Sequence, residues 1–140
     1  MDVIRRNTDY AIRAMAALAE NCGNGLLSAR KIAEMQDISA QLTSKLLQTL
    51  CSADLVESVM GSRGGFRLAR DPSKITLNEI VSAVQGRLCV CSCVVDDGFC
   101  PRKQDCPVCR RLEQLQSMID SCMEDITLDE FAVPVKDGKC

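Results

Sequence analysis

The sequence predicts a mostly helical protein with one β-hairpin and a long final helix that follows a cysteine-rich loop. Three observations support this fold class. The core must be built from aliphatic side chains, because the 140 residues include three Phe, one Tyr and no Trp. Apolar residues recur at helical spacing over most of the chain, and hydroxyl side chains precede several of these stretches. One Gly-rich segment separates two short extended runs, as in a hairpin.

The first helix is expected to run from about Thr8 to Asn21. Thr8 carries a hydroxyl that can cap the start of the helix. Gly23 lies just behind the end, where a glycine commonly terminates a helix. Apolar residues fill the stretch between these signals, so the helix has a face to bury.

Two shorter helices joined by a tight turn are expected next. Ser28 can cap a helix through Met35, and Ser39 can cap a second helix with leucines at helical spacing on one face. The opposite face of the second helix is polar and, apart from Lys45, uncharged. This order of elements is typical of a helix-turn-helix.

After these two helices the spacing of the apolar residues is no longer helical, and two short extended runs flank residues 60–65. That segment contains three glycines and predicts a β-hairpin, because glycines permit the backbone conformations of a tight reversal. Pro72 ends the hairpin. Thr76 and Glu79 then have capping-box spacing and open a helix that stops at Gly86.

Six cysteines lie within the twenty-one residues from Cys89 to Cys109, and the chain has no histidine. Residues 87–106 show neither helical nor strand periodicity, so we expect a loop that is ordered when a bound metal ties its thiols together. Thiolates without histidine favour iron-sulfur clusters, zinc or cuprous copper. A disulfide framework is not expected, because the chain starts without an apolar secretory leader.

A long helix is predicted to begin at Pro107, since the fixed φ of proline suits a first helical position. Apolar residues follow at spacings of three and four and form a seam that one helix cannot bury alone. We expect this seam to pair with its copy in a second subunit, the alternative being that it folds back on the first domain. The expected dimer interface is Leu112, Leu115, Ile119 and Cys122.

The chain is expected to divide into a domain of residues 1–87, a cysteine-rich loop of residues 88–106, the long helix with a short following helix over residues 107–132, and a tail of residues 133–140. Residues 1–87 carry 11 Lys and Arg against 9 Asp and Glu, and the rest carries 6 against 10. This asymmetry allows a nucleic-acid surface in the first domain. No apolar run approaches the roughly 18 residues of a membrane span, so we expect a cytoplasmic protein.

The order of these elements and five stretches of sequence resemble the Rrf2 family of bacterial winged-helix regulators, over nearly the whole chain. The stretches are Asp9 to Ala11, Ile38 to Leu50, Gly61 to Leu68, Ile75 to Gly86 and Ile126 to Leu128. The resemblance implies a homodimeric transcription regulator with a winged helix-turn-helix, in which the hairpin is the wing and the long helix forms the dimer. The sequence does not favour an enzyme, because it has no His for general base work and no phosphate-binding loop.

In cluster-bearing members of this family three loop cysteines hold an iron-sulfur cluster, and the resemblance implies Cys93, Cys100 and Cys106 here. The fourth ligand varies within the family. We favour Cys109, because sulfur is the stronger iron ligand and a helix start stabilises thiolates and an anionic cluster. The partner subunit's Asp9 is the fallback fourth ligand. Four thiolates serve either the two-iron or the four-iron form, so the cluster type stays open.

The resemblance also implies that the second helix of the pair enters the major groove of double-stranded DNA, while the wing contacts the backbone or the minor groove. A two-fold dimer would read a pseudo-palindromic operator. The alternative, a merely solvated polar face, stays open. The expected contact residues are Ser39, Gln41, Ser44 and Lys45 in the helix, Arg63 and Arg67 on the wing, and Arg5 and Arg6 before the first helix.

Our main interpretation is a DNA-binding regulator whose operator binding is controlled by a cluster that senses redox, nitric oxide or cluster status. Two alternatives stay open. Cys106 and Cys109 could join two upstream cysteines in a closed zinc site, or Cys89, Cys91 or Cys93 could oxidise reversibly, which gives a zinc- or thiol-based redox regulator. Cluster-free members of the family suggest a regulator that acts through a protein partner.

Overall fold

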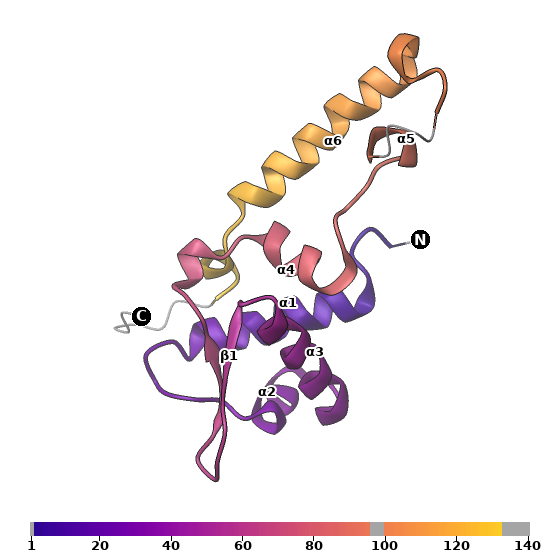
Figure 1. The fold of residues 1–140 in the computed structure, drawn as a ribbon. Coiled ribbons are helices and arrows are strands. Elements are labelled where there is room, and N and C mark those ends of the chain that lie inside the picture. The colour runs from indigo at the N-terminus through magenta and orange to yellow at the C-terminus, as the bar shows by residue number, and fades with distance from the viewer. Residues whose placement is uncertain (1, 96–99, 133–140) are drawn as a thin grey trace.

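Figure 1 shows a cluster of helices. A hairpin projects from one edge of this cluster, and one long helix extends away from the cluster in another direction. The computed structural model describes residues 2–95 and 100–132. The helices are α1 (Arg6–Glu20), α2 (Ala29–Gln36), α3 (Ala40–Ser52), α4 (Leu77–Gln85), α5 (Ser92–Val95) and α6 (Pro107–Asp125), the strands are β1 (Val56–Val59) and β2 (Gly65–Leu68), and the 3-10 turns are η1 (Pro72–Lys74), η2 (Lys103–Asp105) and η3 (Leu128–Phe131). The predicted fold class, mostly α with one antiparallel hairpin, is confirmed.

The core lies among α1, α2, α3 and α4 and is aliphatic, as the scarcity of aromatic residues predicted. Its fully buried side chains include Met15, Ile32, Leu47 and Ile80. Leu128 of η3 joins the same core, because the chain returns after α6 and the backbone N–H of Leu128 donates to the carbonyl of Ile75 at 2.9 Å. The end of the described chain is therefore tied to the first domain.

Three of the predicted helix caps are confirmed. The hydroxyl of Ser28 accepts from the backbone N–H of Lys31, and Ser39 caps α3 in the same way. Thr76 and Glu79 form a reciprocal capping box at the start of α4. These contacts span only a few residues, which explains why the local sequence was sufficient to predict them.

The prediction for the start of α1 is wrong. The helix begins at Arg6 rather than Thr8, and Arg5 at the cap position makes no side-chain cap hydrogen bond. Thr8 lies inside the helix with no exposed surface, where its hydroxyl donates to Oε1 of Gln85 at 2.6 Å. Gln85 comes from α4, 77 residues away, so the partner that holds Thr8 is not visible in the neighbouring sequence.

The predicted hairpin is confirmed at residues 56–68. β1 pairs antiparallel with β2, with Val56 opposite Leu68. Two glycines in the connection are required by the backbone: Gly61 has a φ of 116°, and a Cβ at Gly64 would collide with the carbonyl oxygen of Val59. The hairpin projects from the helical cluster as a wing (Figure 1).

The cysteine-rich segment is more regular than predicted. We expected residues 87–106 to have no helix, but α5 and the turn η2 lie within it. The physical reason is contact with the long helix, since α5 packs against α6. Residues 96–99 of this segment and the predicted tail of residues 133–140 lie outside the described residues.

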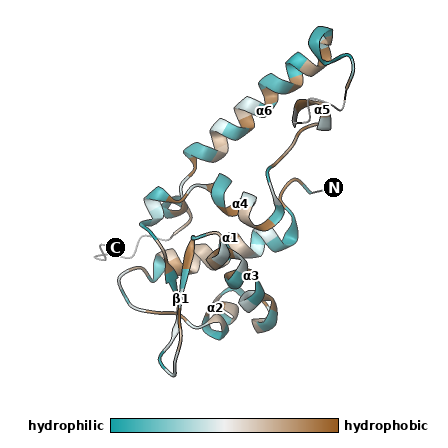
Figure 2. Ribbon diagram, viewed as in Figure 1, coloured by the Kyte–Doolittle hydropathy of each residue, from teal (hydrophilic) through white to brown (hydrophobic). Residues whose placement is uncertain are grey.

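α6 begins at Pro107, as predicted, and packs against α4 and α5. Polar and apolar residues alternate around its surface along its whole length (Figure 2). Only three of its residues, Cys109, Gln116 and Met123, are buried. Within the described ranges, none of the helices combines the length and the apolar character that a membrane crossing requires.

Candidate functional site

The outward face of α3 is polar and open. Gln41 and Lys45 are exposed and Ser44 is half-buried, whereas the hydroxyl of Ser39 is engaged in the cap at the helix start. The opposite face buries Leu46, Leu47 and Leu50 in the core, which fixes the direction of the polar face. The polar residues line a shallow hollow of about 390 Å³ together with Leu42 and Gln48. The structure therefore brings the four predicted α3 residues together.

The basic residues of the wing differ in their surroundings. Arg63 is exposed in the connection between the strands and has no acidic partner among the residues that the structure describes. Arg67 forms an ion pair with Glu57 on the opposite strand, at 2.8 Å between Nε and Oε2. Arg63 is therefore the freer cation of the two.

The structure does not bring Arg5 and Arg6 to the wing. Both side chains are exposed, but the start of α1 lies on the side of α4 and α5, away from the tip of the hairpin (Figure 1). Arg5 is fixed through its backbone N–H, which donates to Gln85 at 2.9 Å. Any contact that these two residues make with a ligand is thus separate from the wing.

Sulfur atoms gather where α5 meets the first turn of α6. Sγ of Cys91 lies 3.2 Å from Sγ of Cys93, and Sγ of Cys89 donates to the carbonyl of Cys91 at 3.1 Å. Cys109 is 2% exposed, and its Sγ lies 3.7 Å from the carbonyl oxygen of Cys93 and 3.8 Å from Oε1 of Glu113. Cys109 thus connects the upstream loop to α6.

The neighbouring thiols of Cys91 and Cys93 have different acidities. The backbone N–H of Cys93, followed by its thiol, lowers the pKa of Cys91. The thiol of Cys91, burial and the thiol of Cys109 together raise the pKa of Cys93 to about 12. Cys91 is therefore the thiol that ionises first, with Cys93 as its hydrogen-bond donor.

Two of the four predicted cluster ligands lie together in the structure. Cys93 and Cys109 are neighbours, while the thiols of Cys100 and Cys106 are half-buried and make no hydrogen bond to another described cysteine. Within residues 2–95 and 100–132, no group of three or more Cys, Asp or Glu side chains is arranged to hold a metal ion. The chemistry of the donors fits a thiolate-bound metal or cluster, but the set is not closed in this arrangement.

Asp9, the fallback ligand, lies on α1. It forms an ion pair with Arg13, with 3.0 Å between Oδ2 and Nε. The pair is an exposed i,i+4 contact on one helix, so it leaves the carboxylate accessible from outside the chain.

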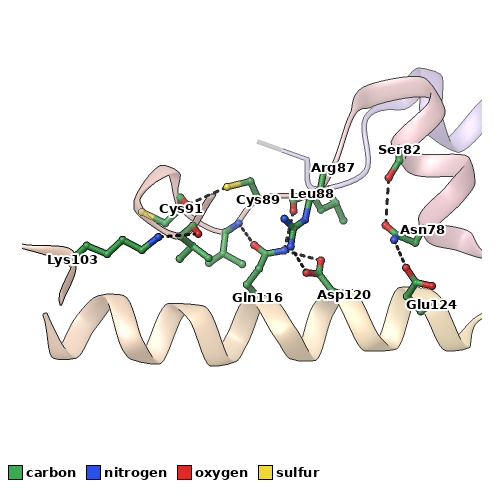
Figure 3. Close-up of polar contacts among 12 residues, drawn as sticks. Asn78, Ser82, Arg87, Leu88, Cys89, Cys91, Lys103, Gln116, Asp120 and Glu124 are labelled. Atoms are coloured by element: carbon green, nitrogen blue, oxygen red, sulfur yellow. Dashed lines mark hydrogen bonds and ion pairs between the residues drawn. The ribbon is translucent and has the colours of Figure 1, made fainter. Parts of the chain in front are cut away.

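One polar side chain that the sequence did not reveal holds the loop on α6. Gln116 is 3% exposed; its Oε1 accepts from the N–H of Val90, and its Nε2 donates to the carbonyl of Leu88, both at 2.9 Å. The same Nε2 lies 2.9 Å from Oδ1 of Asp120, whose other oxygen binds Arg87 at 2.5 Å. Figure 3 shows these contacts in a row along the helix. The hydrogen bond from Arg87 and that from Gln116 lower the pKa of Asp120.

A signal for Gln116 existed in the sequence. Cys109, Gln116 and Met123 are seven residues apart, and the structure buries all three on one face of α6. That spacing indicates a helix face in contact with a neighbour. A glutamine in the middle of such a face predicts a hydrogen-bonded partner. It was missed in the sequence because only the apolar seam of this helix was considered.

The predicted dimer seam occupies another part of α6. Leu115 is 44% exposed, Cys122 is exposed, and Leu112 and Ile119 are half-buried. Leu115 and Ile119 line a hollow of about 550 Å³ that the segment before α1 and the start of the cysteine loop also border. The chain itself therefore leaves this apolar seam largely uncovered, and the dimer contact stays a prediction.

Comparison with known proteins identifies relatives over almost the full length. The sequence model of the Rrf2 family, described as "Iron-dependent Transcriptional regulator", matches residues 4–134. The HTH-type transcriptional regulator IscR of Aliivibrio salmonicida is 32% identical over 124 residues, which cover 89% of this chain and 73% of that protein. Protein aau3 of Rhizobium meliloti is 30% identical over 129 residues, which cover 91% and 83%.

Solved structures agree with this result. CymR, the global cysteine regulator of B. subtilis, has a TM-score of 0.76 at 25% identity and covers 94% of this chain and 97% of its own. IscR of T. potens has a TM-score of 0.71 at 30% identity and covers 91% and 84%. The family model, IscR of Aliivibrio salmonicida and CymR of B. subtilis are all described as regulators and not as enzymes, which agrees with the sequence prediction for this chain. The polar α3 face, the wing and the match over residues 4–134 together show that the chain belongs to the Rrf2 family of DNA-binding transcriptional regulators.

Proposed function

We propose that the chain is a homodimeric regulator in which an iron-sulfur cluster, held by the cysteine loop, controls binding to a pseudo-palindromic operator. One observation carries this proposal: the loop is fastened to α6 at two points, by Cys109 in the first turn and by Gln116 in the middle. A change at the thiols would therefore act directly on the long helix. The family's description as iron-dependent supports iron as the metal.

The proposed ligands are Cys93, Cys100, Cys106 and Cys109, with the partner subunit's Asp9 as the fallback in place of Cys109. Cys93 and Cys109 are already adjacent, and Cys106 lies at the cap position of α6. When bound, a cluster supplies a centre that changes with oxidation, nitric oxide or loss of iron. The residues of the chain hold that centre and connect it to α6.

The proposed DNA contacts are those of a winged helix-turn-helix, within a first domain of residues 1–87. The exposed Gln41 and Lys45 support entry of α3 into the major groove, and the exposed guanidinium of Arg63 supports a phosphate contact from the wing. Residues 88–106 form the sensing loop and residues 107–132 the dimerisation part. The exposed apolar seam of α6 supports pairing with a second copy.

The test of cluster control compares operator affinity in the presence and absence of the metal. Protein purified without oxygen should contain iron and acid-labile sulfide and absorb visible light. Its operator affinity should differ from that of the metal-free dimer by about 5- to 150-fold. Cys106→Ala should behave like the metal-free dimer, whereas Cys51→Ala, a half-buried cysteine at the end of α3, should behave like the wild type.

Two results would count against the proposal. Equal affinity of loaded and metal-free dimers would remove cluster control. A colourless protein that contains zinc and no sulfide would favour the zinc regulator instead.

The DNA surface is tested independently of the metal. Lys45→Ala combined with Arg63→Ala should weaken binding and lower the salt dependence, the slope of log affinity against log salt, by about two. Arg110→Ala combined with Arg111→Ala removes the same charge from the exposed start of α6 and serves as the matched control. An equal loss in both double variants would contradict the placement of the DNA surface on α3 and the wing.

A further inference from the structure

The close contact between Cys91 and Cys93 is not needed for the ligand set proposed above, because Cys91 is not among those ligands. Their Sγ atoms are 3.2 Å apart, and a disulfide bond is about 2.05 Å long, so closure requires a movement of about 1 Å. Both residues are half-buried rather than enclosed, so a small molecule can reach them.

We propose that Cys91 and Cys93 form a reversible disulfide by exchange with a low-molecular-weight disulfide, and that this bond withdraws Cys93 from metal binding. The second part rests on the proposed function, in which Cys93 is a ligand. The pair is then a thiol switch that decides whether the loop can take up its metal. Such a switch responds to the ratio of small disulfides to small thiols.

The reaction balances in two exchange steps. The sulfur of Cys91 attacks one sulfur of the small disulfide, which releases one small thiol and leaves Cys91 in a mixed disulfide. The sulfur of Cys93 then attacks the sulfur of Cys91, which releases the second small thiol and forms the internal bond. The protein loses two hydrogen atoms in total, and the small disulfide is reduced to two thiols. An excess of small thiol reverses both steps.

The other nearby cysteines are less suited to this reaction. The thiol of Cys89 donates to the carbonyl oxygen of Cys91 at 3.1 Å, so it is directed at the backbone rather than at the neighbouring sulfur. Cys109 is 2% exposed, which shields it from a small disulfide, and it also lies against Glu113. The geometry therefore selects Cys91 as the partner of Cys93.

The experiment uses the full-length protein, freed of metal under nitrogen and incubated with oxidised glutathione. Remaining thiols are alkylated, and the tryptic peptide of residues 88–102 is analysed by mass spectrometry. The wild-type peptide should lose two hydrogen atoms and leave two of its four cysteines unalkylated. In Cys91→Ser, any internal disulfide in this peptide should form about tenfold or more slowly than in the wild type. In the matched control Cys89→Ser, the rate of internal disulfide formation should stay close to that of the wild type.

Three results would overturn the disulfide. An internal bond that forms in Cys91→Ser at the wild-type rate would assign Cys93 to another partner. Loss of the bond in Cys89→Ser would assign it to Cys89. A wild-type peptide that carries glutathione and no internal bond would show that the second exchange step does not occur.

Iron uptake tests the withdrawal of Cys93. Oxidised wild type should take up about tenfold less iron and sulfide than reduced wild type, dithiothreitol should restore uptake, and the same oxidation should leave uptake by Cys91→Ser unchanged. Equal uptake by oxidised and reduced wild type would overturn the withdrawal. If the reduced protein takes up no iron at all, the proposed cluster function fails, and the peptide masses still decide whether the disulfide forms.

Discussion

The first domain and the cysteine loop on α6 are held together by different forces. Met15, Leu47 and Ile80 are fully buried in the first domain, where many apolar contacts act at once. The loop is attached through Gln116 and Cys109, which contribute a few directional contacts. Burial of one large aliphatic side chain is worth about 1.5–3 kcal/mol, whereas one hydrogen bond contributes a net of about 0.5–1.5 kcal/mol.

The difference shows where a chemical signal can act. A close-packed apolar core has few alternative arrangements, so we expect the first domain to keep its shape when a thiol of the loop changes. A segment held by a few hydrogen bonds can be moved by one new bond at a sulfur atom. The first domain, for which we propose DNA binding, and the loop, for which we propose sensing, thus differ in their mode of stabilisation as well as in their place in the sequence.

The largest effect is expected from a cavity in the first domain. Leu47→Ala removes a side chain with no exposed surface and should lower the free energy of unfolding by about 2–5 kcal/mol, measured by urea denaturation. The control is Met60→Ala, because Met60 is 91% exposed in the hairpin connection and its loss should change stability by less than about 0.5 kcal/mol. A similar decrease in the free energy of unfolding in both variants would mean that the hairpin connection is not exposed to solvent as described.

A smaller and more local effect is expected from Gln116→Leu. Leucine has a similar volume but leaves the N–H of Val90 and the carbonyl of Leu88 without their partner, which costs about 1–3 kcal/mol. Hydrogen exchange of the Val90 amide should accelerate, while amides of α1 and α3 should keep their protection. Gln114→Leu is the matched control, since Gln114 is exposed two residues away on the same helix. Unchanged exchange at Val90 would contradict the role of Gln116.

These two sites also show how far the sequence can be interpreted. Leu47 was predicted as part of a buried face because helical spacing is a local pattern, and the caps at Ser28, Ser39 and Thr76 were predicted for the same reason. Gln116 was missed. Its seven-residue spacing from Cys109 and Met123 marks one face of α6, but its hydrogen-bond partners lie 26 and 28 residues away and cannot be identified from the neighbouring sequence.

The cysteine loop could be predicted in composition but not in arrangement. The spacing of the thiols predicts a site for soft metals, and the polar face of α3 predicts a DNA surface; both stay predictions. The contact between Cys91 and Cys93 and the position of Cys109 between the loop and α6 depend on tertiary packing. The same holds for Thr8, whose hydroxyl is fixed by a residue from another helix.

An intermediate effect is expected at the edge of the first domain, from Glu79→Gln. Burial alone would raise the pKa of Glu79, but the backbone N–H of Thr76 and the guanidinium of Arg70 outweigh it and lower that pKa below 4.5. Because the pKa of Glu79 is lower in the folded protein, its charge stabilises the fold above pH 4.5. This stabilisation is lost as the pH falls through the folded pKa. The variant should be less stable by about 0.5–1 kcal/mol at neutral pH. The difference in the free energy of unfolding between the variant and the wild type should disappear in acid, as measured by denaturation at several pH values. A difference that does not change with pH would contradict the role of the charge.

The smallest effect is expected from Arg87→Gln, at the point where the two regions meet. Arg87 is 56% exposed, so loss of its ion pair with Asp120 should cost at most about 1 kcal/mol and less in high salt. The pKa of Asp120, followed by NMR, should rise toward its ordinary value of 3.8, because its largest lowering contact is gone. Exchange of the Val90 amide should stay close to wild type, since Gln116 keeps both of its loop contacts. If Arg87→Gln accelerates hydrogen exchange of the Val90 amide as strongly as Gln116→Leu does, the loop is held by charge rather than by the buried side chain of Gln116. Its attachment to α6 should then weaken as the ionic strength rises.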